Sequence, residues 1–276
     1  MDAHTWTPWR RGENASSAPA LLLTALGEFV LPGGGTAWTS TLIDAMGVLD
    51  VEPKTARQAI GRTAAAGLLT SERVGRQVRW SLTAPATKLL TDGAERIYQF
   101  GRHPEPWDGR WLVVLVTVPE TNRRLRYRLR VSLGWQGFAS IGPGVWVSPW
   151  VAREATAASV LEELGLAAEA LSFAAEPGAL GALGERVYQA WDLAAVESEY
   201  QEFIEVTGAK APATATDHFV DLVTLVHDWR HFPAADPGLP ERLLPGPWPG
   251  RAAAEIFHDR HGRWRQDAWR WWHDHT

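Results

Sequence analysis

The feature that most constrains the fold is a predicted helix followed directly by two short strands. Pro53 suits the first position of a helix, and Gly67 ends the helical pattern. Residues 69–74 and 78–82 then read as two strands on either side of a turn at Gly75. A helix that runs into a two-stranded hairpin is typical of a winged helix.

Two more helices are expected before this one. Apolar residues recur at helical spacing over residues 18–31, and Pro32 with the following glycines ends that pattern. Thr39 is expected to cap a short second helix that Gly47 ends. Three helices and a hairpin predict a winged helix-turn-helix over residues 17–100.

The third helix has two faces of different character. At about 100° per residue, one face gathers small and apolar side chains, Ala56, Ala59, Ile60 and Thr63. The opposite face carries side chains able to read base edges in a DNA major groove, Lys54, Thr55, Gln58 and Arg62. Arg57 lies off the centre of that face and is expected to contact a phosphate or an ion-pair partner. The alternative is an ordinary solvated helix face.

The predicted hairpin carries three arginines, Arg73, Arg76 and Arg79, which can grip phosphates or enter a minor groove. The alternative is that these charges only prevent strand aggregation. Between Glu52 and Trp80 six basic residues oppose two acidic ones, a local excess of four positive charges in a chain of net charge −5. This local excess favours double-stranded DNA as a partner.

The rest of the chain predicts two further domains. Residues 101–183 begin with a linker and then alternate strands and helices, at 111–118, 123–133, 137–148, 152–164 and 170–174. This order is typical of a ferredoxin-like α/β domain. Residues 184–276 are mainly helical, near 194–206, 216–231 and 252–273. The sequence thus predicts an α+β protein with a flexible tail, residues 1–16, a winged helix, a ferredoxin-like middle domain and a helical C-terminal domain for effector sensing or dimerisation.

Several motifs along the chain are similar to those of the PaaX family, repressors of phenylacetic-acid catabolism. They are Leu21-Leu22-Leu23-Thr24, Thr55-Ala56-Arg57-Gln58-Ala59, Trp107-Asp108-Gly109-Arg110-Trp111, Pro143-Gly144-Val145-Trp146, Asp236-Pro237 and Trp248-Pro249-Gly250. The resemblance implies a homodimeric repressor of an aromatic-degradation operon. It also implies release from operator DNA by an aryl-CoA thioester such as phenylacetyl-CoA, or by another acyl-CoA.

The predicted middle helix carries a dense basic run, Arg123, Arg124, Arg126, Arg128 and Arg130. Three uses are open for it. These arginines can bind the phosphates of a CoA-type effector, form ion pairs with acidic helices of the C-terminal half, or touch DNA that flanks the operator.

The principal alternative function is a Cas2-like metal-dependent nuclease, because the predicted middle domain resembles that fold. Such nucleases hold a metal with an aspartate at the end of the first strand, whereas this chain has Thr117-Val118-Pro119-Glu120 there. We therefore expect no enzymatic activity and no catalytic residues. A DNA-binding architectural protein without an effector is the other alternative.

No cofactor or metal site is expected. The chain has no cysteine, which excludes disulfides, thiolate ligands and thiol nucleophiles. His227 and His231 stand one helical turn apart, and His258 and His261 share a side of a later helix, but we expect packing roles for them rather than zinc ligation. No run of about 18 apolar residues occurs, which predicts a cytoplasmic protein without a membrane span.

Overall fold

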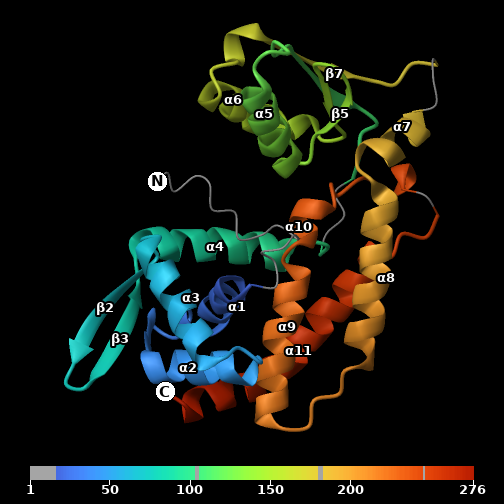
Figure 1. Cartoon of the computed structure of the whole chain (residues 1–276). Coiled ribbons are helices and arrows are strands. Elements are labelled where there is room, and N and C mark those ends of the chain that lie inside the picture. The colour runs from blue at the N-terminus through green and yellow to red at the C-terminus, as the bar shows by residue number, and fades with distance from the viewer. Residues whose placement is uncertain (1–16, 103–105, 180–182, 245) are drawn as a thin grey trace. The chain divides into compact units, whose positions relative to one another are not determined.

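The computed structural model describes residues 17–102, 106–179, 183–244 and 246–276 (Figure 1). Its residues form two compact units. The first unit contains the described residues up to Arg102, together with Glu202–His231 and Ala252–Thr276. The second contains the described residues between His103 and Gln201, together with Phe232–Arg251. The predicted tail, residues 1–16, lies outside the described residues.

The first unit begins with the elements of a winged helix. They are α1 Ala18–Ala25, its π-helical continuation Leu26–Val30, β1 Thr36–Trp38, α2 Thr39–Val48, α3 Pro53–Ala65, β2 Leu69–Val74, β3 Gln77–Leu82 and α4 Ala84–Gln99. The strands form an antiparallel sheet in the order β1-β3-β2, and the β2–β3 hairpin projects beyond the helices (Figure 1). Three helices and a hairpin therefore occur where the sequence predicts them.

The start of α2 differs from the prediction. Thr39 is the first helical residue rather than the cap, and the cap position belongs to Trp38. The Thr39 hydroxyl instead donates to the Val78 carbonyl at 3.1 Å and accepts from Trp80 Nε1 at 2.9 Å. The reason is β1, a strand that the sequence pattern does not predict and that pairs with β3 up to Trp38. Gly47 also lies inside α2, which ends at Val48.

Helices from the C-terminal part of the chain complete the first unit: the second half of α8 Leu193–Ala209, then α9 Ala215–Trp229 and most of α11 Gly250–Asp274. Helices α9 and α11 lie beside the winged helix (Figure 1), and aromatic rings make the contact. Phe29 lies 5.0 Å from Phe219 of α9 and 5.2 Å from Trp272 of α11, measured between ring centroids. The sequence predicts consecutive domains along the chain, with a boundary at residue 184. The first compact unit instead combines residues from the N-terminal part of the chain with residues from its C-terminal part.

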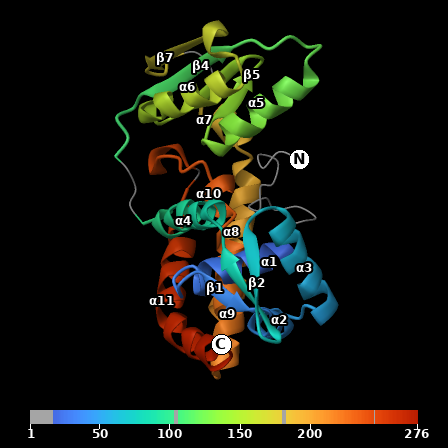
Figure 2. The same cartoon turned by 90° about the vertical axis from the view of Figure 1, so that its left-hand side faces the viewer.

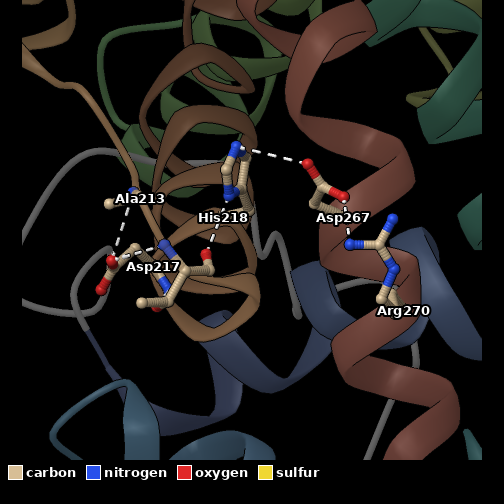
Figure 3. A network of polar contacts seen from close by, with 6 residues as sticks. Ala213, Asp217, His218, Asp267 and Arg270 are labelled. Atoms are coloured by element: carbon tan, nitrogen blue, oxygen red, sulfur yellow. Dashed lines mark hydrogen bonds and ion pairs between the residues drawn. The ribbon is translucent and has the colours of Figure 1, made fainter.

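A polar network joins the beginning of α9 to α11 (Figure 3). Thr214 caps α9 by accepting from the Asp217 backbone N–H at 3.1 Å, and the Asp217 carboxylate accepts from Thr214 N at 2.9 Å. Hydrogen bonds from Thr214 lower the pKa of Asp217. On α11, Asp267 lies 3.7 Å from His218 Nε2 and pairs with Arg270 at 2.8 Å. These contacts fix the start of α9 beside α11.

The second unit is built on a four-stranded sheet. Its elements are β4 Trp111–Val116, α5 Arg123–Trp135, β5 Ala139–Gly142, β6 Val145–Ser148, α6 Glu154–Glu163, β7 Ala170–Ala175, α7 Leu183–Ala190, the first half of α8 and α10 Phe232–Ala235. All pairs are antiparallel, in the order β5-β6-β4-β7. This order is that of a ferredoxin-like sheet, so the predicted α+β fold class is confirmed.

Helices α5 and α6 lie over one face of this sheet (Figure 2). Leu112 and Val114 of β4 form a core with Leu129 and Leu133 of α5. The opposite face is covered by a second cluster that includes Trp111 and Leu239. Both faces of β4 are therefore buried, which explains its continuous apolar sequence. No helix among the described residues is both long and apolar enough to cross a membrane.

The proline-rich stretch before α11 is organised by a buried carboxylate. Asp236 accepts hydrogen bonds from Tyr200 Oη at 2.8 Å, from Gly238 N at 2.7 Å and from Trp248 Nε1 at 3.3 Å. The Tyr200 ring also stacks on Phe232 at 4.1 Å. Burial raises the pKa of Asp236, against the lowering effect of its three donors.

We predict that Asp236→Asn lowers the free energy of unfolding by about 1–3 kcal/mol, because at least one buried donor loses its acceptor. The pKa of Asp236 is higher in the folded chain than its ordinary value of 3.8. Its protonation therefore stabilises the fold fully below that value, and this contribution is lost as the pH rises through the raised pKa. Urea unfolding from pH 4 upward should show the stability of the natural protein falling relative to that of the Asn variant. Parallel pH profiles would contradict this assignment.

Candidate nucleic-acid interface

Helix α3 is fixed by the face that the sequence predicts to be buried. Ala56, Ala59, Ile60 and Thr63 are each no more than 2% exposed. This face packs on α1 and α2, and Thr63 Oγ1 donates to the Ala59 carbonyl at 2.9 Å. Pro53 occupies the first turn, as expected. The helix is therefore a rigid support for the side chains on its other face.

The opposite face of α3 is exposed and positively charged. The predicted DNA-reading residues on it are all solvent-exposed, Lys54, Thr55, Arg57, Gln58 and Arg62. Within the part of the chain that the structure describes, none of its three cationic side chains forms an ion pair. Unpaired guanidinium and ammonium groups on a rigid helix can donate to base edges or phosphates.

The hairpin presents its arginines unequally. Gly75, with φ of 62°, makes the turn, and Arg76 is exposed beside it. Arg73 is also exposed, and its Nε donates to the Gly75 carbonyl at 3.3 Å. Arg79 pairs with Glu72 at 2.9 Å, and its guanidinium lies 5.9 Å from the Trp38 ring centroid. Arg73 and Arg76 are thus better placed for phosphates than Arg79.

The Glu72–Arg79 pair is a feature that the sequence reading did not predict. The two residues are direct cross-strand partners in the β2–β3 register. Opposite charges that face each other across a hairpin form such pairs. A turn at Gly75 and Arg76 places Glu72 opposite Arg79, so the strand register could have predicted this ion pair from the sequence.

The five arginines of the middle helix all lie on α5 and are exposed, Arg123, Arg124, Arg126, Arg128 and Arg130. Arg126 donates to the Glu120 carbonyl at 2.9 Å, and Arg130 lies 5.8 Å from the Tyr127 ring centroid. No ion pair joins any of the five to a carboxylate among the described residues of the second unit, so the pairing with acidic side chains is not found within that unit. Effector binding and contact with DNA that flanks the operator both stay predictions for these arginines.

The histidines considered as zinc ligands lie in other contacts. His261 Nε2 is 3.1 Å from a Glu28 oxygen, and His227 Nδ1 is 3.2 Å from Thr24 Oγ1. The His258 ring contacts Phe257, and burial lowers the pKa of His258. Within the described ranges, no three histidine or carboxylate side chains come together as metal ligands do. Cas2-like nucleases hold their metal at the end of the first strand of this domain. Here that strand, β4, ends at Val116, and Glu120 is exposed beyond it.

Comparison with known proteins gives matches along most of the chain. Residues 17–86 match the family model described as PaaX-like protein, residues 104–187 the PaaX protein central Cas2-like domain, and residues 191–274 the PaaX-like protein C-terminal domain. The transcriptional repressor PaaX of Escherichia coli is 29% identical over 252 residues, which are 87% of this chain and 78% of that protein.

The fold is also similar to that of a solved structure. The uncharacterized protein Rv0674 from Mycobacterium tuberculosis matches with a TM-score of 0.61 at 24% identity, over 92% of this chain and 99% of that one. This likeness concerns the fold alone. Three consecutive family models, together with a repressor that matches most of the chain, show that this chain belongs to the PaaX family.

Proposed function

We propose that this protein is a cytoplasmic transcriptional repressor, without enzymatic activity, that binds operator DNA as a homodimer. An aryl-CoA thioester or a related small molecule releases it, and it controls an aromatic-compound catabolic operon. The observation that carries the proposal is α3, whose buried face fixes it to α1 and α2 while Lys54, Gln58 and Arg62 remain exposed beside a basic hairpin. The relative named a transcriptional repressor supports the regulatory role.

Two copies of α3 related by a twofold axis would read half-sites one or more helical turns apart. Lys54, Thr55, Gln58 and Arg62 would contact base edges. Arg57 would contact phosphates, as would the hairpin arginines, chiefly Arg73 and Arg76 and less so Arg79. This division makes sequence preference a property of α3 and salt dependence a property of both elements.

An effector can release the protein from DNA only if it binds the conformation that cannot bind DNA more tightly than the conformation that binds DNA. The first unit offers a direct route for such a change, because α9 and α11 contact the helix that supports α3. Thr24 of α1 meets His227 of α9 at 3.2 Å, and Glu28 meets His261 of α11 at 3.1 Å. A ligand that displaces either C-terminal helix would therefore move the support of the DNA-reading helix.

The hairpin arginines give a separate prediction. Arg73→Ala with Arg76→Ala should lower affinity for all duplexes alike and reduce the slope of log K against log salt by about 0.9 for each phosphate that the variant no longer neutralises. Arg79→Ala serves as the matched control and should change the slope less, because Glu72 already neutralises that guanidinium. Anisotropy titrations over a salt series measure both. A changed ratio between operator and shuffled DNA would mean that the hairpin reads bases.

The proposed function is tested by fluorescence anisotropy on labelled DNA from upstream of the protein's own gene, with and without phenylacetyl-CoA and related thioesters. We expect tight, salt-sensitive binding that one thioester reverses. Binding that no thioester changes would favour an architectural protein or a different effector class. Metal-dependent cleavage of the duplex would favour the nuclease alternative.

A further inference from the structure

Helix α5 lies in the most positively charged stretch of the chain. Between residues 121 and 153 the sequence has six arginines and no aspartate or glutamate, although the whole chain has a net charge of −5. Five of these arginines are on α5, and all five are exposed. Such a local concentration of charge creates a positive potential that attracts polyanions.

The arginines are carried by a helix that is firmly held. Leu129 and Leu133 are 3% and 0% exposed and pack in the core between α5 and the sheet. Asn122 caps the helix by accepting from Leu125 N at 3.1 Å. The exposed guanidinium groups therefore project from a fixed support, and no carboxylate among the described residues of the second unit pairs with them.

The arrangement of the charges distinguishes between two kinds of phosphate ligand. At about 100° per residue, the five arginines spread over an arc of about 200° around the helix. They also span about 10 Å along its axis, at 1.5 Å per residue. Side chains that diverge over this arc do not all converge on one small phosphorylated molecule. A duplex presents phosphates of both strands along its whole length, one charge per about 1.7 Å of axis, so the arginines on one side of the arc can each meet a different phosphate.

An aromatic side chain stands within the same arc. Tyr127 is 52% exposed, and the Arg130 guanidinium lies 5.8 Å from its ring centroid. Tyrosine hydroxyls and arginines are both frequent donors to DNA phosphates. The exposed face of α5 thus carries side chains of the types that contact the sugar-phosphate backbone of DNA.

We infer that α5 is a second DNA-binding surface, which contacts phosphates of the duplex flanking the operator rather than the phosphates of the effector. The inference rests on the proposed function, since it presumes that α3 binds the operator. Helix α5 then adds affinity that depends on salt and not on base sequence. Of the three uses that the sequence left open for these arginines, the inference thus selects contact with DNA that flanks the operator.

The test uses the full chain with four substitutions, Arg123→Gln, Arg124→Gln, Arg128→Gln and Arg130→Gln. Its matched control carries lysine at the same four positions, because lysine keeps the charge that phosphates require. Dissociation constants are measured over a salt series on a duplex that extends about one turn beyond the operator on each side, and on a shuffled duplex. We expect the salt slope of the glutamine variant to fall by about 0.9 for each phosphate that it no longer neutralises. Its operator-to-shuffled ratio and its melting temperature should match those of the natural protein, and the lysine control should keep the slope.

An unchanged salt slope in the glutamine variant would overturn the inference and leave the proposed function standing. Normal DNA binding combined with the absence of release by a thioester would also overturn it, by assigning the arginines to the effector. If the natural protein prefers no DNA sequence, the proposed function itself fails, a result separate from either of these.

Discussion

Replacing Phe219 by alanine is expected to lower the free energy of unfolding by about 3–5 kcal/mol. Phe219 is 0% exposed and lies on α9. Its ring centroid is 5.0 Å from that of Phe29 and 4.0 Å from that of Trp271. The substitution would leave a cavity between the winged helix and two C-terminal helices, and these rigid aromatic neighbours can fill it only partly.

Urea unfolding followed by tryptophan fluorescence measures this loss. The matched control is Phe173→Ala on β7, where the ring is 52% exposed and the loss should stay below about 0.5 kcal/mol. A loss of less than about 1 kcal/mol for Phe219→Ala would contradict the packing of α9 on the winged helix. DNA affinity should fall together with stability, because α1 supports α3.

The second large effect is expected on DNA recognition. The double variant Gln58→Ala and Arg62→Ala should lose most of its preference for the operator, because each bidentate base contact contributes about 1–3 kcal/mol of discrimination. Both side chains are exposed, so the melting temperature should change little. Competition titrations of operator against shuffled duplex measure the preference.

The control for this variant is Lys88→Ala, an exposed cation of the first unit that pairs with Asp92 on α4. It should keep the full operator preference. If the double variant also kept it, the base-reading role of α3 would be wrong. If the double variant failed to fold, the assignment of the two faces of α3 would be wrong instead.

The sequence predicted those parts of the fold that depend on local patterns. Pro53 and Gly67 bound α3 closely, because proline and glycine act on the backbone at their own positions. The strand and helix order over residues 111–175 likewise indicated a ferredoxin-like sheet, since few topologies satisfy that order.

The parts that were not predicted depend on distant partners. The three residues of β1 form a strand only because β3 pairs with them, at Trp38↔Arg79 for example. The apolar face of α9 predicts a helix that packs, but it does not name Phe29 as its neighbour. The burial of Asp236 likewise depends on Tyr200, 36 positions away in the chain.

The candidate site was predictable to a similar extent. The two faces of α3 follow from periodicity alone, and the exposure of Gln58 and Arg62 agrees with it. The unequal roles of the hairpin arginines were not predictable without the register that pairs Arg79 with Glu72. The choice among uses for α5 needed the absence of carboxylate partners among the described residues of the second unit, which only the structure provides.

The most direct test of the central claim is the ratio of two dissociation constants of the natural protein, measured at one stated salt concentration. One constant is for DNA from upstream of its own gene, and the other is for a shuffled duplex of the same length. Recognition by α3 predicts that the upstream DNA binds at least about 10³-fold more tightly. Equal affinities for the two duplexes would contradict the assignment of this protein as a sequence-specific repressor.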